Sequence, residues 1–550
     1  MFHSVHHGRA VHAKLIKGSI SSFLFLQNHL LNLYVKSGDL ANGYKLFEEM
    51  PHRNVVSWSA IIAGFVKHGY PSQALSLFGL MHRDGTTMPN EFTLVSALHA
   101  SSLSDNLTQA YQIYAFVVRL GFQFNIFLNN AFLTVLIRHG RLEDALEVFE
   151  KFPNKDIVSW NAMMAGYLQY SCLEVPALWF RMMREGVKPD NFTFASILTG
   201  LAALSDLKMG LRVHAQIVKG GHGGEICIGN SLVDFYIKNE KLADAFLVFH
   251  EMPLHDVCSW TQIAAGCVTC GEPGKALEAI AQMKEMGVRP NKFTLATALN
   301  ACANLASLQE GERVHGLRIK LGTEIDVRVD NALLDMYAKC GCLDAAWCVF
   351  RSLRNRSVVS WTTMITCCAQ NGQVRKALEI FEEMKGDGVQ PNHITFICVL
   401  YACGQGGFID EGWKYFSMIR DYGISPGEDH YVCMVNLLGR AGHIKEAEEL
   451  IVRMPSKPGV LVWQTLLGAC IVHGDLETAK RAAGHVMDLD RKDPSTYVLL
   501  SNMFAGMKNW DHVDMLRDLM DSRNVKKMPG SSWIELEESF LPPPALQGFA

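Results

Sequence analysis

Small polar side chains recur at a fixed register along this chain of 550 residues. An amide can donate and accept hydrogen bonds side by side, and a hydroxyl presents a different pattern, so a regular series of both could recognise successive polar groups of a ligand. For any single residue of this kind at the start of a helix, capping is the simpler explanation. The series comprises Ser59, Asn161, Thr261 and Thr362, each directly after a tryptophan, and Asn28, Asn130, Asn230 and Asn331 in a second motif.

Motifs for catalysis or for a bound metal are lacking. A zinc deaminase requires H-x-E together with P-C-x-x-C, yet no histidine in this sequence is followed two residues later by glutamate. The C-x-x-C from Cys267 to Cys270 lies inside a predicted helix, and we interpret its cysteines as ordinary residues of the repeat without a role in metal binding. The four histidines from His3 to His12 fall in a broken repeat, and we interpret them as incidental. We therefore predict that the protein is not an enzyme and needs no metal or cofactor.

The polar series is carried by a sequence repeat. Tryptophans at positions 58, 160, 260, 361 and 463 lie in five related stretches, with spacings of 102, 100, 101 and 102 residues. Self-similarity at a fixed period is typical of repeat architectures, in which each unit contacts only its neighbours. The repeat therefore overrides the roughly four globular domains that the length alone would suggest.

Three types of unit alternate, and each unit is predicted to form two helices. In 157–169 the apolar residues follow the spacing of one helical face. Ser159 and Thr193, with their equivalents in other units, are predicted to cap the first helices, and Pro153 or a Gly-x-x-Pro to end the second ones. The first type covers 24–54, 126–156, 226–256 and 327–357, the second 55–90, 157–190, 257–291 and 358–392, and the third 91–125, 191–225, 292–326 and 393–427.

Stacking such hairpins buries the apolar stripe that a single hairpin leaves exposed. We therefore predict an all-α fold, an α-solenoid superhelix of stacked helix-turn-helix repeats whose first helices line one face. The net charge of −4 argues against non-specific coating of nucleic acid. No apolar run reaches the roughly 18 residues of a membrane span. The 15 cysteines, mostly in apolar helical runs, favour a reducing compartment.

Two motifs carry a family resemblance. W-N-A-M-M-A-G-Y (160–167) and N-A-L-L-D-M-Y-A-K-C-G (331–341) resemble the pentatricopeptide repeat proteins of plant organelles, and the alternating unit lengths resemble their long-short subclass. Segments within 430–504 resemble the C-terminal E-type extension of that subclass, and no DYW deaminase domain is expected after Glu537. The resemblance divides the chain into a truncated repeat (1–23), tandem repeats (24–427), a divergent short repeat (428–459), the extension (460–528) and an atypical tail (529–550).

The register of the first residues predicts that the chain begins inside a repeat. The stretch 8–18 matches 210–220 and 311–321, which places Gly8 well inside a unit. The resemblance implies a mitochondrial or chloroplast protein, and the targeting segment is expected to lie outside this sequence.

In the family, the fifth and last residues of a unit together read one RNA base, and such repeats use two or three side chains per base. A mismatched base would leave a polar group unpaired, at a cost of about 1–3 kcal/mol. Units with an apolar fifth residue, and the pair Val432/Gly459, give no assignment, so the implied site is 5′-Y-A-n-U-U-n-U-A-n-C-A-n-n-3′. The implied pairs are Asn28/Asn54 for a pyrimidine, Ser59/Asn90, Thr261/Asn291 and Thr362/Asn392 for A, Asn130/Asp156, Asn161/Asp190 and Asn230/Asp256 for U, and Asn331/Ser357 for C.

A stripe of basic residues lies eight positions beyond the fifth residue, where the family faces RNA phosphate. The alternative is a solvated helix end, because cations are also favoured near the C-terminal end of a helix dipole. The stripe consists of Lys36, Lys67, Arg138, Lys238, Lys339 and Arg440.

The resemblance implies a sequence-specific adaptor that binds single-stranded organellar RNA and specifies sites of C-to-U editing, a form of RNA modification. We expect it to recruit a deaminase or other editing-factor proteins in trans through 428–536 and to contact no membrane. One alternative keeps RNA binding but serves transcript stability or splicing. Another is a helical-repeat scaffold for proteins, whose polar groove residues would vary without pairing between the fifth and last positions.

Overall fold

The computed structural model describes residues 23–523, except 105, 323–325, 491–493, 507 and 509, together with Val525. Within these ranges the chain forms thirty α-helices, one short 3-10 helix and no strand, which confirms the all-α prediction. None of these helices is long and apolar enough to cross a membrane. The histidines from His3 to His12 and the predicted tail lie outside the described residues.

The chain divides into two compact units, 1–263 and 264–550. The boundary falls inside α16 (Val257–Thr269). The first unit contains α2 (Leu24–Ser37), α3 (Leu40–Glu49), α4 (Val55–Lys67), α5 (Pro71–Asp84), α6 (Glu91–Leu103), α7 (Leu107–Arg119), α8 (Ile126–Arg138), α9 (Leu142–Glu150), α10 (Ile157–Tyr170), the 3-10 helix η1 (Cys172–Glu174), α11 (Val175–Arg184), α12 (Asn191–Ala203), α13 (Leu207–Lys219), α14 (Ile226–Lys238) and α15 (Leu242–Glu251).

The second unit continues the same alternation to the C-terminal helices. It contains α17 (Pro273–Glu285), α18 (Lys292–Leu305), α19 (Leu308–Leu321), α20 (Val327–Lys339), α21 (Leu343–Ser352), α22 (Val358–Gln370), α23 (Val374–Gly386), α24 (His393–Gly406), α25 (Ile409–Asp421), α26 (Glu428–Arg440), α27 (Ile444–Val452), α28 (Val460–His473), α29 (Leu476–Leu489), α30 (Pro494–Gly506) and α31 (Trp510–Ser522).

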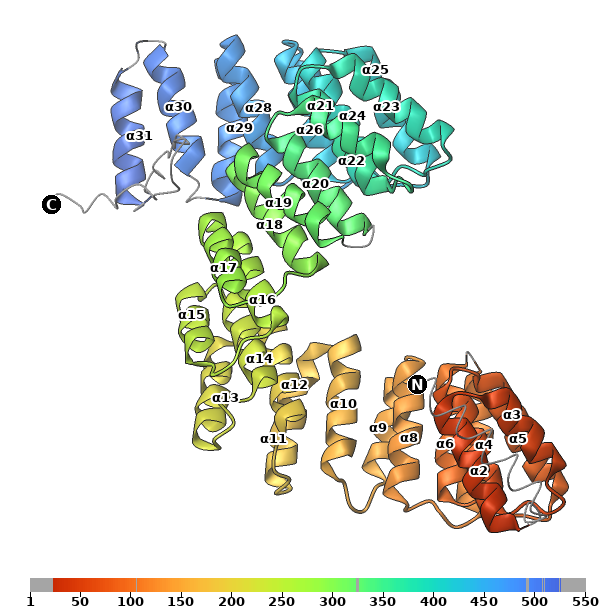
Figure 1. Cartoon of the computed structure of the whole chain (residues 1–550). Coiled ribbons are helices and arrows are strands. Elements are labelled where there is room, and N and C mark those ends of the chain that lie inside the picture. The colour runs from red at the N-terminus through yellow and green to blue at the C-terminus, as the bar shows by residue number, and fades with distance from the viewer. Residues whose placement is uncertain are drawn as a thin grey trace. The chain divides into compact units, whose positions relative to one another are not determined.

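Within each unit the even-numbered helices are the first helices of hairpins, and they stack on one another. In the first unit α4 contacts α2 and α6, and α10 contacts α8 and α12. In the second unit α20 contacts α18 and α22, and α26 contacts α24 and α28. The odd-numbered helices pack against the first helix of their own hairpin and that of the next, as α5 does against α4 and α6. Successive hairpins can be followed by colour in Figure 1, and this stacking is the predicted solenoid arrangement.

Edge-to-face aromatic contacts join each short repeat to the tryptophan stretch that follows it. Phe149 of α9 packs against Trp160 of α10 with ring centroids 4.9 Å apart and ring planes at 83°, a geometry that the ring quadrupoles favour. Trp160 is fully buried, so this contact holds one hairpin on the next and explains why the tryptophans mark the repeat. The same contact recurs in Phe47/Trp58, Phe249/Trp260 and Phe350/Trp361 at 4.8, 4.8 and 4.9 Å.

The first helices are capped one turn earlier than predicted. Asp156 and Asp190 are the N-caps of α10 and α12, and their carboxylates accept the backbone N–H of Ser159 and Thr193 at 2.8 Å. The prediction that Ser159, Thr193 and their equivalents are caps is therefore wrong, because these residues hold the third helical position, and Asp190/Thr193 form a complete capping box. The other caps with such a third residue are Asn54/Ser57, Asn90/Thr93, Asp256/Ser259, Asn291/Thr294, Ser357/Ser360 and Asn392/Thr395.

A glycine lets the second helix of one hairpin approach the first helix of the next. A Cβ atom at Gly210 in α13 would overlap the ring of Phe235 in α14. Gly311 in α19 meets Met336 of α20 in the same way. These two glycines occupy one register of the repeat, so packing explains why glycine is found there.

Candidate nucleic-acid interface

The predicted Asn-type pairs are joined by hydrogen bonds between neighbouring first helices. Nδ2 of Asn161, in α10, donates to Oδ1 of Asp190, the N-cap of α12, at 3.0 Å. Because α10 and α12 stack side by side, the start of one helix lies beside the cap of the next. The equivalent bonds are Asn28–Asn54 at 3.1 Å, Asn130–Asp156 at 3.1 Å, Asn230–Asp256 at 3.5 Å and Asn331–Ser357 at 3.4 Å.

The hydroxyl of the third helical residue lies within hydrogen-bond distance of both members of a pair. Oγ1 of Thr193 lies 2.8 Å from Oδ1 of Asn161 and 2.7 Å from Oδ1 of Asp190. The amide of Asn161 and the backbone N–H of Thr193 also donate to Oδ1 of Asp190, and the second carboxylate oxygen of the cap takes part in none of these bonds. That second atom is an acceptor in Asp and a donor in Asn. The same hydroxyl bridge joins Ser57 to Asn28, Ser159 to Asn130 and Ser360 to Asn331 at 2.6, 2.7 and 2.8 Å.

The aspartate caps are held in their ionised form. Burial by itself would raise the pKa of Asp190, but hydrogen bonds from Thr193 and Asn161 outweigh it, and the pKa lies below its ordinary value. The same balance lowers the pKa of Asp156 and Asp256. At neutral pH these caps therefore present acceptor oxygens only.

Where the fifth residue is Ser or Thr, its hydroxyl turns back onto its own helix. Ser59, Thr261 and Thr362 donate to the carbonyl four residues earlier, in each case at 2.7 Å. Such back-bonding uses the single hydroxyl proton and keeps the short side chain against the helix. More space is thereby left beside the cap than an asparagine would leave.

These hydroxyl-type pairs differ in how they meet their caps. Oγ of Ser59 lies 3.3 Å from Oδ1 of Asn90. Thr362 reaches Asn392 only through Thr395, whose hydroxyl lies 3.2 Å from that of Thr362 and 3.0 Å from Oδ1 of Asn392. In the remaining pair, Thr261 belongs to the first compact unit and Asn291, the cap of α18, to the second.

Two of the four repeats of the third type, 91–125 and 292–326, use a different residue to contact the next cap. Their fifth residues, such as Val95 and Ala296, are apolar and cannot bond to it. Instead the first residue of the repeat reaches the last one. Nδ2 of Asn125 donates to Oε2 of Glu91 at 2.6 Å, and Lys292 forms an ion pair of 2.9 Å with Asp326.

The sequence analysis did not predict a row of exposed apolar side chains near the fifth-to-last pairs. Val158 is 54% exposed and Phe192 72%. Val158 precedes Asn161 by three residues on α10, so both lie on one helical face, and Phe192 follows the cap Asp190 by two. An apolar residue outside the buried stripe is the signal that could have revealed the row. It consists of Phe25, Val56, Phe92, Phe127, Val158, Phe192, Phe293, Val359, Ile394 and Leu461.

The six basic residues of the predicted stripe lie in the last turn of first helices and are exposed. Lys238 forms an ion pair with Asp234 one turn earlier on α14, at 2.8 Å. Lys339 does the same with Asp335 on α20, also at 2.8 Å. Their position fits both interpretations, a phosphate-binding stripe and cations placed at the C-terminal ends of helix dipoles.

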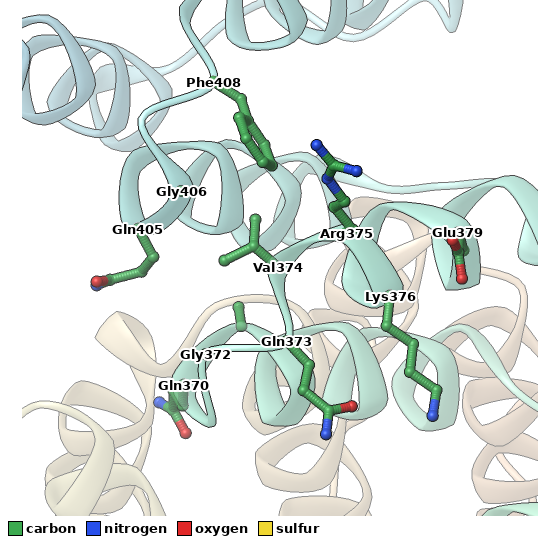
Figure 2. A pocket seen from close by; sticks show the side chains of 11 residues that line it. Gln370, Gly372, Gln373, Val374, Arg375, Lys376, Glu379, Gln405, Gly406 and Phe408 are labelled. Carbon is green, nitrogen blue, oxygen red and sulfur yellow. The ribbon is translucent and has the colours of Figure 1, made fainter.

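A hollow in the second unit lies along the same register as the stripe (Figure 2). Gln370 and Gln405, which line it, stand eight residues beyond the fifth residues of their repeats, and Arg440 donates to Oε1 of Gln405 at 2.9 Å. Arg375 and Lys376, from the first turn of α23, also line the hollow and extend in different directions in Figure 2. The repeat 358–392 therefore carries positive charge at the start of its second helix, whereas Gln370 gives it an amide in the register of the stripe.

The C-x-x-C motif lies at the end of α16, where Cys267 is in the last turn and Cys270 directly follows the last helical residue, Thr269. Cys267 is fully buried, and burial raises the pKa of its thiol to about 11, so it stays protonated at neutral pH. A buried protonated thiol is typical of a packing residue. Among the described residues, no group of three or more His, Cys, Asp or Glu side chains is placed to hold a metal ion.

Comparison with family models agrees with the repeat pattern. The E motif model matches 473–535, the pentatricopeptide repeat domain model 112–167 and the PPR repeat family model 356–405. The PPR repeat model matches 28–55, 56–86, 158–187, 230–257, 258–288, 331–358, 394–424 and 429–458.

Known proteins resemble the chain over most of its length. A pentatricopeptide repeat-containing protein of Arabidopsis thaliana is 36% identical over 536 residues, which cover 96% of this chain and 54% of the relative. A second from the same plant is 35% identical, covering 96% and 78%. The chain thus spans about half the length of the first relative and about three quarters of the second.

Solved structures show the same fold at low sequence identity. The maize pentatricopeptide repeat protein PPR10 has a TM-score of 0.55 at 17% identity, covering 90% of this chain and 84% of that one. Its complex with an 18-nt psaJ RNA element has a TM-score of 0.58 at 16% identity, with the same coverage. The family resemblance inferred from the sequence is therefore confirmed, and the chain belongs to the plant pentatricopeptide repeat family.

Proposed function

We propose that the protein is an adaptor that binds single-stranded RNA in a sequence-specific manner. The observation that carries the proposal is the ladder of fifth-to-last pairs, in which an Asp or Asn cap such as Asp190 has one oxygen fixed by the protein and a second polar atom left for a ligand. The pairing argues against a protein-binding scaffold, whose groove residues would vary independently. A maize relative in fold has been solved with an RNA element, which supports a nucleic-acid ligand.

The second atom of the cap would select among bases. Uracil and guanine present an N–H donor at the centre of the Watson–Crick edge, whereas cytosine and adenine present a lone pair there. An ionised Asp cap accepts and would favour the first group, while an Asn cap can donate and would favour the second. A fifth-position Asn would favour a small pyrimidine, and Ser or Thr would leave room for a purine. These arguments lead to U for Asn161/Asp190 and A for Ser59/Asn90.

The exposed apolar row would hold each base in place. Val158 shares a helical face with Asn161, Phe192 follows Asp190 by two residues at the start of the next first helix, and both apolar side chains are exposed. A base whose edge meets Asp190 could then stack against these side chains, as bases do on apolar and aromatic surfaces of single-strand binders. Stacking of this kind is tolerant of sequence, so the discrimination would come from the caps.

A binding assay tests this function directly. The RNA 5′-Y-A-n-U-U-n-U-A-n-C-A-n-n-3′ is expected to bind at least tenfold more tightly than a shuffled RNA of equal composition, equivalent to about 1.4 kcal/mol or more. Fluorescence anisotropy at fixed salt measures both dissociation constants. Equal affinity for the two RNAs would refute the assignment of bases to the fifth-to-last pairs.

The biological role that we propose is the specification of C-to-U editing sites in a mitochondrion or chloroplast, with a deaminase recruited in trans through the C-terminal extension. The match to the E motif and relatives named as chloroplastic or mitochondrial support this role. Organelle transcripts would be sequenced from plants with and without the gene. If every C just downstream of a matching site were edited to the same extent in both, editing would be rejected in favour of a role in transcript stability or splicing.

A further inference from the structure

We propose that Glu428 is a specificity-determining residue, which supplies the base-reading acceptor of the repeat 428–459. This inference rests on the RNA-binding function proposed above. The fifth and last residues of this repeat, Val432 and Gly459, have no polar side chain. With those two residues alone, the repeat would have no side chain that could form a hydrogen bond with its nucleotide.

The carboxylate of Glu428 lies where the side chain of a cap would be. Gly459 is the N-cap of α28, the place that Asp190 holds for α12. Oε1 of Glu428 accepts the backbone N–H of Gly459 at 3.0 Å. A Cβ atom built on Gly459 would meet the carboxylate, 2.9 Å from both its Cδ and its Oε2. The glycine therefore makes room for a carboxylate that comes from the neighbouring first helix.

Glu428 can reach this place because it begins α26 one turn before Val432. Residues four apart share a helical face, so a long side chain at the first position can reach the same region as the side chain of the fifth residue. The repeats 91–125 and 292–326 show the same reach, in which Glu91 contacts Asn125 and Lys292 contacts Asp326. A first residue that contacts the next cap is thus found in two of the four repeats of the third type, and Glu428 gives a further instance.

A carboxylate at this place would select for a base with an N–H donor. An ionised Glu accepts hydrogen bonds and donates none, so U or G would be preferred over A or C at the thirteenth nucleotide of the implied site. The thirteenth nucleotide, which had no assignment, is thereby assigned as U or G. Affinities for four RNAs that carry A, C, G or U at this nucleotide, and are otherwise identical, would show which of the two bases is preferred.

The variant Glu428→Gln separates base reading from helix capping. Its amide oxygen can still accept the N–H of Gly459, while its amide nitrogen adds a donor. The melting temperature is expected to stay unchanged, and the preference at the thirteenth nucleotide to move from U or G towards A or C. We expect the ratio of dissociation constants to change at least tenfold, measured by anisotropy on the full chain.

A second variant returns the carboxylate to the cap itself. Glu428→Ala removes the acceptor and is expected to abolish the preference at this nucleotide, whereas the double variant Glu428→Ala/Gly459→Asp is expected to restore it. If Glu428→Ala lowers the melting temperature but leaves the preference intact, Glu428 is only a structural cap and the inference is overturned.

A matched control at another repeat tells this inference apart from the function on which it rests. Asp156→Asn gives a pair of the same composition as Asn28/Asn54, so the preference for U over C at the fourth nucleotide is expected to disappear. If that change occurs and Glu428→Gln has no effect, the role of Glu428 is refuted while base reading stands. If neither variant alters any preference, base reading itself fails, and the inference fails with it.

Discussion

The pairs with asparagine at the fifth position, to which we assign base reading, are joined by hydrogen bonds within the protein, without a ligand. In the pair Asn161/Asp190, the cap oxygen receives the amide of Asn161 and the backbone N–H of Thr193, and the Thr193 hydroxyl lies within hydrogen-bond distance of both side chains of the pair. Rigid groups lose less conformational entropy when they bind, so such a pair favours selective binding. Asn230/Asp256 is the exception, because its bond is 3.5 Å long and Oδ1 of Asn230 is buried without a partner among the described residues.

The register of the repeat predicted which residues form these pairs but not how they are joined. The positions of Asn161 and Asp190 follow from comparison of one repeat with the next, and the bond between them depends on the lateral stacking of α10 on α12. The role of Thr193 was misassigned for the same reason. A hydroxyl near a helix start suits both the cap and the third position, and only the backbone geometry separates the two.

Preference for U at the nucleotides facing Asp156 and Asp190 is expected to be constant from pH 8 to pH 5. The pKa values of both carboxyls lie below the usual value, which is about 3.9 for aspartate, so both stay charged across this range. Their contribution to stability is present above that usual value and is lost as the pH falls through the lowered pKa of the folded state. The ratio of dissociation constants for U and C at one nucleotide, measured at several pH values, cancels the titration of distant histidines. A ratio that declines between pH 7 and pH 5 would contradict the assigned charge state.

At the scale of the elements, periodicity alone was sufficient to predict the hairpins. The apolar spacing of each repeat gives one buried stripe per helix, and repetition of the stripe specifies stacking. The exposed row that contains Val158 and Phe192 could not be separated from the core in this way, because an apolar residue next to a buried run looks like part of it. The edge-to-face contact of Phe149 with Trp160 also needed the structure, since the two residues come from different repeats.

Close approach of helices at Gly210 gives a test of hairpin packing. Gly210→Ala is expected to destabilise the protein by about 1–3 kcal/mol, the usual effect of overpacking, because the added methyl group would overlap Phe235. In the equivalent repeat, Ala110 and Val135 occupy these two positions. The double variant Gly210→Ala/Phe235→Val is therefore expected to recover most of the loss in urea denaturation. A single variant as stable as the natural chain would show that the helices do not approach each other so closely.

At the scale of the whole molecule, electrostatics must act locally. The net charge is only −4, so attraction of RNA cannot come from an overall positive field. The basic stripe and the cations around the hollow of Figure 2 concentrate positive charge at the ends of first helices and the starts of second ones. The net charge gave no indication of this arrangement, whereas the repeat register did.

The stripe is expected to contribute affinity without specificity. Alanine at Lys36, Lys67 or Arg138 is expected to weaken binding of matched and shuffled RNAs alike. Removal of one cation that neutralises a phosphate is expected to reduce the slope of log affinity against log salt by about 0.7. Alanine at Lys238 or Lys339 serves as the matched comparison and is expected to have a smaller effect, because these cations are already paired within their own helices. Salt slopes that do not change in any of the five variants would support the helix-dipole interpretation instead.

The side chain to which we assign contact with the RNA is also the one that starts the next helix. Asn, Asp and Ser are among the best N-caps, and their replacement by Ala costs about 0.5–2 kcal/mol. The side chains available for recognition at this place are therefore mostly those that favour the start of a helix, as in Asn90, Asp190 and Ser357. Exchanges within this small set leave every helix start intact. A solenoid of this kind can acquire a new target sequence, one repeat at a time, with little change in its folding stability.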